Sequence, residues 1–134
     1  AQIETIAATV SERARRCMDT FWPGPLSLIF PARAGLSTIL TANTGTICVR
    51  QTACAIARDL CGAFGAPLTS TSANLSGRPP ALSPTDLTLP GLAAVLDGGA
   101  LEPSAPSTIC DPDKGVILRA GCIPSETILQ CLSG

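Results

Sequence analysis

Segments with the apolar spacing of an amphipathic helix alternate along this chain with short runs of apolar and β-branched residues. The helical spacing predicts helices over residues 3–21, 53–64 and 123–132. The runs between them predict strands over residues 26–30, 46–50, 68–72, 94–97, 107–110 and 116–119. This alternation predicts an α/β fold in which helices cover the face of a sheet.

Turn signals between these segments indicate how neighbouring strands run. The segment Asp111–Gly115, with the sequence Asp-Pro-Asp-Lys-Gly, predicts a hairpin turn between the last two strands. Because a hairpin joins antiparallel strands, the sheet is predicted to be mixed. Gly65 is predicted to cap the second helix, and Ser83–Asp86 to begin a further short helix. We expect residues 31–45 to form a loop.

The chain contains no histidine, and this limits the chemistry that it can perform. Serine and cysteine hydrolases with a histidine base are excluded, as are metal sites with an H-E-x-x-H motif. Chemistry at these residues would have to use hydroxyls, arginines, carboxylates, backbone amides or a metal ion that enters with the substrate.

The seven cysteines are scattered along the chain without a C-x-x-C pair. Zinc sites need paired ligands, and an odd number of cysteines fits a secreted disulfide framework poorly. We therefore expect free thiols that pack as small apolar side chains, no tightly bound protein metal site, and a cytoplasmic location. The sequence shows neither a secretory leader nor an apolar run that would span a membrane, so we expect no membrane association.

The charge balance argues against tight binding of nucleic acid. The net charge is -1, and the one basic cluster consists of Arg13, Arg15 and Arg16. A protein that grips nucleic-acid phosphates needs a basic face. We therefore expect weak or no direct nucleic-acid binding by these residues.

Polar side chains on two predicted strands form a candidate site for a small anion. Because side chains alternate along a strand, one face of the strand over residues 46–50 carries Thr46, Cys48 and Arg50. The next predicted strand and the loop after it carry Ser70, Ser72 and Asn74. A guanidinium beside hydroxyls suits a carboxylate or phosphate, which arginine binds through two parallel hydrogen bonds. The alternative stays open that the hydroxyls cap their own turn and that Arg50 lies in water.

Five segments of the chain carry distinctive motifs. Residues 21–30 have the sequence F-W-P-G-P-L-S-L-I-F, and residues 48–50 end a predicted strand in V-R. Residues 67–77 have the sequence P-L-T-S-T-S-A-N-L-S-G, residues 106–109 P-S-T-I, and residues 118–121 L-R-A-G. Taken in order, the five resemble the F-W-P-G-P-L-T, V-R, P-L-x-S-T-S-A-N-x-S-G, P-S-T-V and L-R-x-G motifs of the YrdC-like domain family of L-threonylcarbamoyladenylate synthases, and the match over residues 67–77 is close.

The resemblance implies an α/β fold with a twisted mixed sheet, flanked by helices, whose concave face binds the substrates. By resemblance, L-threonine would be bound by Arg50, Ser70 and Ser107. ATP would be bound by Thr46, Ser72, Asn74 and Arg119, with Asn74 supporting the loop between the two sides. The resemblance assigns no catalytic residue.

The reaction implied by the resemblance is a nucleotidyl transfer. L-Threonine, bicarbonate and ATP would give L-threonylcarbamoyladenylate and pyrophosphate, for the threonylcarbamoyladenosine modification of tRNA. Mg²⁺ would arrive with ATP, and the tRNA-modification machinery would act downstream. Transfer of this kind needs positioning and charge neutralisation more than a histidine base.

Two departures from the family pattern qualify this expectation. Gln51-Thr52-Ala53 follows Arg50, where family members usually carry a proline, and a family lysine–arginine motif that contacts the phosphates is not among these residues. We therefore expect residues 1–134 to be one YrdC-like domain without its N-terminal part, and its activity alone is an open question. The alternatives are a carbamoyl-adenylating domain of a hydrogenase-maturation carbamoyltransferase and a non-catalytic remnant that binds nucleotide or RNA.

Overall fold

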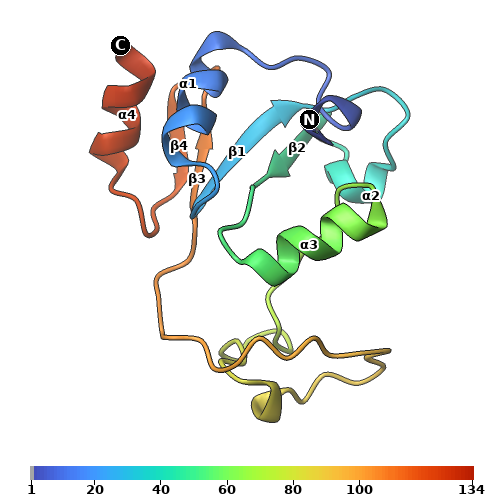
Figure 1. Ribbon diagram of the computed structural model, residues 1–134. Helices are drawn as coiled ribbons and strands as arrows, with labels where there is room; N and C mark the ends of the chain where they lie inside the picture. The colour runs from blue at the N-terminus through green and yellow to red at the C-terminus, as the bar shows by residue number, and fades with distance from the viewer. Residues whose placement is uncertain (1) are drawn as a thin grey trace. The chain divides into compact units, whose positions relative to one another are not determined.

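The computed structural model describes residues 2–134, which form two compact units. The first unit comprises residues 2–67 and Ala105–Gly134, and it contains the sheet and the helices α1 to α4 that Figure 1 labels. The second unit, Leu68–Ser104, consists mostly of irregular backbone.

The sheet of the first unit has the strand order β2-β1-β3-β4. Its members are β1 (Leu26–Pro31), β2 (Thr46–Val49), β3 (Thr108–Asp111) and β4 (Val116–Arg119). β1 runs parallel to β3, whereas β1 with β2 and β3 with β4 form antiparallel pairs. The prediction of a mixed sheet is confirmed, and each of these four strands lies within one residue of a predicted strand.

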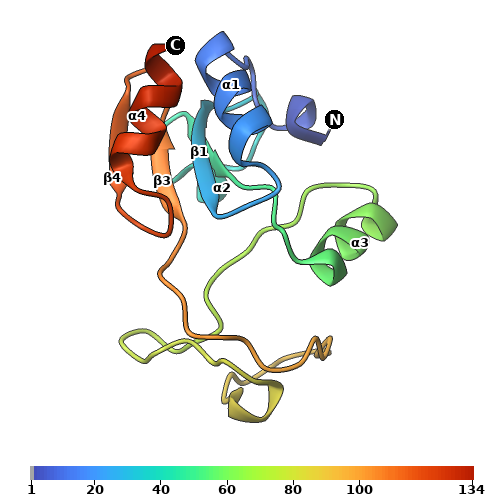
Figure 2. The ribbon, with the colours of Figure 1, turned by 60° about the vertical axis from the view of Figure 1, so that its left-hand side comes forward.

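Two helices, α1 (Glu12–Phe21) and α4 (Ser125–Ser133), lie side by side and pack on one face of the sheet (Figures 1 and 2). Alternate residues of β1 are buried against them, namely Leu26, Leu28 and Phe30. Burial stabilises the folded state by roughly 1.5–3 kcal/mol for each large apolar side chain. The intervening residues of β1 point to the opposite face of the sheet.

The ends of α1 are fixed by local hydrogen bonds. At its start the Ser11 hydroxyl accepts the Ala14 N–H at 3.2 Å, which satisfies one of the free amides of the first turn. At its end the Trp22 indole N–H donates to the Leu26 carbonyl at 2.7 Å, and its ring centroid lies 6.3 Å from that of Phe30. Trp22 therefore attaches the end of α1 to the first strand.

The prediction of one helix over residues 3–21 is wrong in its first half. Gln2–Thr5 forms a short 3-10 helix, and a turn and irregular backbone follow it before α1 begins. There Ala7 makes an isolated antiparallel bridge with Ala32, beyond the end of β1. The apolar spacing persists because Ile3, Ala7 and Val10 all contact the core that α1 also covers. The spacing of apolar residues alone therefore did not show that the helix is interrupted between residues 5 and 12.

Residues 31–45, predicted to be a loop, include a short helix, α2 (Thr38–Thr41). The Ser37 hydroxyl caps it by accepting the Ile39 N–H at 3.2 Å. Ala42 then ends it in the left-handed region with φ of 47°. A helix of one turn leaves too little periodicity in the sequence to be recognised.

The remaining helices follow the predictions closely. α3 (Ala55–Phe64) lies within the predicted range, and Gly65 ends it with φ of 75° while its N–H donates to the Cys61 carbonyl at 3.0 Å. Glycine adopts this left-handed conformation without steric cost, so the predicted C-cap is confirmed. α4 coincides with the predicted helix over residues 123–132 apart from its ends. None of the helices in residues 2–134 is long and apolar enough to cross a membrane.

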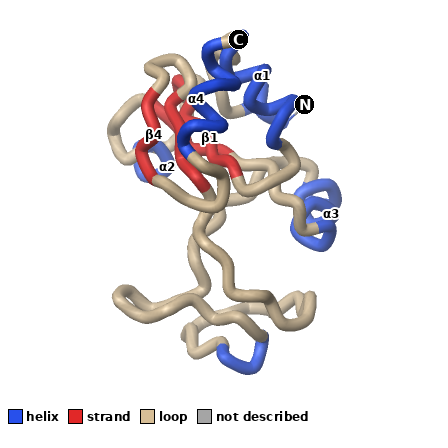
Figure 3. Tube along the Cα trace, turned by 90° about the vertical axis from the view of Figure 1, so that its left-hand side faces the viewer, coloured by secondary structure: helices blue, strands red, loops and turns tan. Residues whose placement is uncertain are grey.

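The predicted strands over residues 68–72 and 94–97 are wrong, because the second unit contains no strand. Figure 3 draws this unit as loop apart from one helical turn, the 3-10 helix Pro84–Asp86. Single backbone hydrogen bonds, such as Leu101 N–H to the Leu82 carbonyl at 2.7 Å, replace a ladder. A strand needs a paired neighbour for its backbone groups, and these apolar runs have none within the unit.

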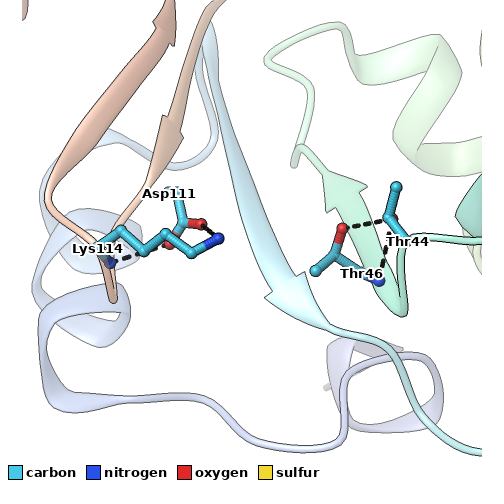
Figure 4. Close-up of polar contacts among 4 residues, drawn as sticks. All are labelled: Thr44, Thr46, Asp111 and Lys114. Atoms are coloured by element: carbon cyan, nitrogen blue, oxygen red, sulfur yellow. Dashed lines mark hydrogen bonds and ion pairs between the residues drawn. The ribbon is translucent and has the colours of Figure 1, made fainter.

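The predicted hairpin turn between β3 and β4 is confirmed. The Asp111 carboxylate accepts the Lys114 backbone N–H at 3.1 Å, and the Lys114 ammonium lies 2.9 Å from the same carboxylate (Figure 4). Gly115 follows with φ of 66°, which returns the chain into β4. The turn thus fixes the register of the strand that carries Arg119.

Candidate functional site on the sheet face opposite α1 and α4

Four polar side chains gather on the sheet face that α1 and α4 do not cover. We call them the polar cluster; its members are Ser27, Cys48, Ser107 and Arg119. Ser27 lies between the buried residues Leu26 and Leu28 and so points to the opposite face. The strand register places Ile29 beside Cys48, and Ile109 beside both Ser27 and Arg119. Three strands, β1, β2 and β4, and the residue directly before β3 therefore contribute to one site.

Hydrogen bonds join three members of the polar cluster. The Ser27 and Ser107 hydroxyl oxygens lie 3.0 Å apart. Arg119 donates from Nη2 to the Ser107 hydroxyl at 3.0 Å, and from Nη2 and Nε to the Ser107 carbonyl at 2.8 and 3.1 Å. The guanidinium is thereby held in one orientation, with Nη1 left for a ligand.

Gly121 allows the segment after β4 to lie directly against the segment before β3. A Cβ at this position would collide with the Pro106 carbonyl and with the backbone of Ser107 and Thr108. The Cys122 N–H then donates to the Pro106 carbonyl at 2.9 Å. Glycine is needed here for this close approach, which fixes the position of Ser107 relative to Arg119.

The Cys48 thiol is exposed and remains protonated at neutral pH. Partial burial of the sulfur raises its pKa, and this outweighs the Arg119 charge and the Ser27 hydroxyl, which both lower the pKa. The polar cluster therefore contains one positive charge, two hydroxyls and a neutral thiol. Such a set is suited to bind the anionic group of a small molecule.

Two further predicted site residues belong to the same unit. The Thr46 hydroxyl lies 2.8 Å from the Thr44 hydroxyl, which also accepts the Thr46 N–H at 3.2 Å (Figure 4). Thr46 and Cys48 are two residues apart in β2, and side chains at this spacing point to the same face of a strand. The prediction that they share a face is therefore confirmed. Arg50 follows the last residue of β2, is exposed, and makes no hydrogen bond or ion pair within residues 2–134. Its guanidinium is therefore available to a ligand.

The other predicted site residues belong to the second unit. Ser70 and Ser72 are exposed and lie on irregular backbone, so the argument that they share a strand face does not hold. Asn74 donates from Nδ2 to the carbonyls of Leu75 and Arg78 at 3.0 and 2.8 Å and thus holds the loop between them. Its Oδ1 is buried without a partner. Roles for these residues toward Arg50 or Arg119 remain predictions.

The loop that Asn74 holds borders a cavity of about 370 Å³ within the second unit. Its charged lining residues are Arg78 and Asp86.

Residues 2–134 contain no group of three or more histidine, cysteine, aspartate or glutamate side chains that could hold a metal ion.

Ser27 and Cys48 were not among the site residues predicted from the sequence. Cys48 had been placed on the same strand face as Arg50, but as a thiol it was given no role. Ser27 occupies the position of the threonine in the F-W-P-G-P-L-T segment, and it is a hydroxyl between apolar residues. A polar residue flanked by core residues in a strand is a signal that could have identified it.

Comparison with protein families shows a match to the Sua5/YciO/YrdC family model, described as telomere recombination, over residues 1–121. The chain is 37% identical to threonylcarbamoyl-AMP synthase of Bacillus subtilis, covering 95% of this chain and 38% of that protein. It is 43% identical to threonylcarbamoyl-AMP synthase of Xanthomonas axonopodis, covering 78% of this chain and 58% of that protein. The chain thus spans between 38% and 58% of the length of these two relatives.

Comparison with solved structures supports the same grouping. Sua5 of Pyrococcus abyssi in complex with L-threonine matches with a TM-score of 0.88 and 31% identity, over 97% of this chain and 40% of that chain. A variant of the same protein matches with a TM-score of 0.86. The predicted YrdC-like α/β fold is therefore confirmed.

Proposed function

Because the chain belongs to the Sua5/YciO/YrdC family, we propose that it is part of an L-threonylcarbamoyladenylate synthase. The enzyme is a nucleotidyltransferase that consumes L-threonine, bicarbonate and ATP, releases pyrophosphate, and supplies the threonylcarbamoyladenosine modification of tRNA. The observation that carries this proposal is the polar cluster, in which Arg119 is oriented by Ser107 on the free face of a sheet with this family's fold.

The reaction makes demands that this set of residues suits. The threonine amine first takes up bicarbonate as a carbamate, with loss of water. A carbamate oxygen then attacks the α-phosphorus of ATP, and the bond to the β-phosphate oxygen breaks as pyrophosphate leaves. Negative charge is present throughout, so oriented cations and correct positioning account for most of the catalysis. Arginines and hydroxyls meet these demands without a histidine.

We assign L-threonine binding to Arg50, Ser70 and Ser107, and ATP binding to Thr46, Ser72, Asn74 and Arg119. For Arg50 the assignment is supported by its unengaged guanidinium beyond the end of β2. For Arg119 it is supported by the hydrogen bonds that hold Nε and Nη2 and leave Nη1 for a phosphate oxygen.

In the proposed reaction Mg²⁺ arrives bound to ATP and neutralises part of the negative charge of the phosphates. The tRNA-modification machinery acts on the product, and direct nucleic-acid binding by this chain is weak or absent. The seven unpaired thiols support a cytoplasmic location, since reducing compartments keep cysteines free.

The threonine side is tested by substitution of Arg50 in the protein at its natural length. Arg50→Ala should weaken threonine binding in calorimetry by about 1.5–3 kcal/mol, the value of a hydrogen bond to a charged group. Arg50→Lys should restore only part of the affinity, because an ammonium lacks the planar fork. Arg13→Ala removes an exposed arginine from α1 and serves as the control. If threonine affinity is unchanged in Arg50→Ala, the assignment of Arg50 to L-threonine binding is wrong.

The ATP side is tested with Ser72→Ala in the same protein. Pyrophosphate release that depends on ATP should fall, while threonine affinity should stay near that of the unsubstituted protein. A loss of threonine affinity with unchanged ATP affinity would mean that the two sides of the site are reversed.

A further inference from the structure

We propose that Ser27 is a positioning residue: its hydroxyl orients the Ser107 hydroxyl and, through Ser107, the Arg119 guanidinium. This inference rests on the proposed function for its consequence in substrate binding. The hydrogen-bonding arrangement itself is a property of the first unit and is tested separately below.

The number of hydrogen bonds that the Ser107 hydroxyl can donate and accept explains why Ser27 controls its orientation. Arg119 Nη2 donates to the Ser107 hydroxyl oxygen, so Ser107 accepts one hydrogen bond and has one proton of its own to donate. The Ser27 oxygen lies 3.0 Å from it, and either hydroxyl can be the donor. If Ser27 donates, the Ser107 proton is directed to a ligand. If Ser107 donates, it is held in place by Ser27. In both cases Ser27 determines where the Ser107 proton points.

The position of Ser27 separates this role from a purely structural one. Its neighbours Leu26 and Leu28 are fully buried on the helix side of the sheet, and they provide the packing of β1 in this region. Ser27 itself is 7% exposed, and its hydroxyl faces the polar cluster on the other side. Loss of the hydroxyl therefore leaves the apolar core in place but removes a hydrogen bond from the site.

Cys48 supplies a reporter of this arrangement that does not depend on catalysis. The Arg119 charge and the Ser27 hydroxyl both lower the pKa of the Cys48 thiol, against the larger effect of burial, which raises it. A change in either neighbour should therefore change the pH at which Cys48 becomes reactive, since the thiolate is the nucleophile.

The first experiment measures the alkylation rate of Cys48 by iodoacetamide as a function of pH, with peptide-resolved mass spectrometry. The exposed thiol of Cys54 serves as the internal reference. Ser27→Ala should move the Cys48 profile to higher pH, and Ser27→Thr, which keeps a hydroxyl and suits a strand, should restore it. Thermal unfolding of each variant shows that the fold is retained.

A double-mutant cycle tests whether Ser27 positions Arg119. Arg119→Ala should also move the Cys48 profile to higher pH. If Ser27 orients Arg119 through Ser107, the effect of Arg119→Ala should be smaller in the Ser27→Ala background, so the two shifts should not add. Fully additive shifts would overturn the proposal, as would an unchanged Cys48 profile in Ser27→Ala.

The consequence for substrate is measured by threonine calorimetry on the protein at its natural length. Ser27→Ala should weaken binding roughly 2- to 12-fold, the range for one neutral hydrogen bond, and Ser27→Thr should restore it. Unchanged threonine affinity in Ser27→Ala would contradict the proposed role toward substrate. If the unsubstituted protein fails to bind threonine, the proposed function fails, and the double-mutant cycle alone then decides the role of Ser27.

Discussion

At the scale of single residues, the position of Ser107 is determined from both sides. Gly121 lets the backbone after β4 approach it, and the side chain of Thr108, the next residue, ties β3 to the segment that precedes α4. The Thr108 hydroxyl donates to the Ile123 carbonyl at 2.8 Å and accepts the Ile123 N–H at 3.1 Å. A fully buried hydroxyl thus satisfies both backbone groups of Ile123.

We expect Thr108→Val to destabilise the protein by about 1–3 kcal/mol, because it leaves the Ile123 N–H and carbonyl without partners at constant side-chain volume. Thr69→Val, at an exposed threonine, should change the stability by less than about 0.5 kcal/mol. Urea unfolding followed by circular dichroism measures both values. Equal midpoints for the two variants would show that the Thr108 hydroxyl contributes nothing.

Two buried thiols should make the stability depend on alkaline pH. Burial raises the pKa of Cys17 from 9.0 to about 12, with further contributions from Cys131 and Cys110, and burial raises the pKa of Cys110 to about 11. A pKa that is higher in the folded state gives stability that is complete below pH 9 and is lost as the pH rises toward 11–12. The chain has no tyrosine, whose phenol would otherwise titrate in the same range.

The urea midpoint should therefore fall as the pH is raised from 8.5 to 11. In Cys17→Ala this decrease should be smaller, whereas Cys54→Ala, at an exposed thiol, should behave like the unsubstituted protein. A flat stability profile over this range would contradict the expected burial of the two thiols.

The prediction of site residues succeeded where the residues lie in a strand, because side chains in a strand alternate between its two faces. Thr46 and Cys48 share a face because β2 exists and is paired with β1. The same argument failed for Ser70 and Ser72, because no neighbouring strand pairs with their segment within its unit. Ser27 was missed because the argument considered strand ends and not the polar positions inside a core strand.

At the scale of elements, the sequence correctly predicted the helices and strands that combine a regular apolar pattern with a turn or capping residue at their end. The strands of the hairpin were placed correctly because Asp111–Gly115 is a turn in itself, and α3 because Gly65 ends it. The first helix was predicted too long because the residues before Ser11 pack on the same core without being α-helical. The same pattern of burial thus occurs in an α-helix and in other backbone conformations, and a capping residue is needed to tell them apart.

One arginine of α1 forms hydrogen bonds with the last backbone carbonyls of α4. Arg16 in α1 donates from Nε to the Cys131 carbonyl at 3.3 Å and from Nη2 to the Leu132 carbonyl at 3.0 Å, in the last turn of α4. These carbonyls have no partner within their own helix, and a positive charge at a helix C-terminus is favourable. Arg16, placed in a basic cluster by the sequence, therefore joins two helices.

We expect Arg16→Ala to destabilise the protein by about 1–2 kcal/mol and to increase hydrogen exchange in α4. Arg16→Lys should recover part of the loss, because one ammonium cannot reproduce both bonds of the guanidinium. Arg13→Ala, on an exposed position of the same helix, is the matched control and should leave exchange in α4 unchanged. Equal exchange in Arg16→Ala and the control would show that Arg16 does not hold α4.

At the scale of the whole molecule, the five motifs fall in both units. The segments around Trp22, Arg50, Ser107 and Arg119 belong to the first unit, and most of the P-L-x-S-T-S-A-N-x-S-G signature to the second. Motif order identified the family, because it does not depend on how each segment folds. The local structure of the signature did not follow from it, since the same residues suit both a strand and a loop of hydroxyls and glycine.

The last prediction concerns the activity of these 134 residues by themselves. The proposed site residues include two cations, Arg50 and Arg119, and Arg50 is assigned to the threonine carboxylate. The lysine–arginine motif expected for the phosphates is not among these residues, whose one lysine, Lys114, pairs with Asp111. Loss of a single oriented donor at a developing charge can reduce a rate by about 10²–10³. We therefore expect no pyrophosphate release that depends on threonine and bicarbonate.

A coupled assay of pyrophosphate measures this directly, with the full-length Bacillus subtilis threonylcarbamoyl-AMP synthase as the positive control, since the chain covers 38% of that protein. The 134 residues should give no signal above a control without threonine, although they should unfold cooperatively. A longer protein that carries these residues together with the lysine–arginine motif should perform the reaction, and Arg119→Ala in that longer protein should abolish most of it. Robust release by the 134 residues alone would show that Arg50 and Arg119 are sufficient to neutralise the phosphates.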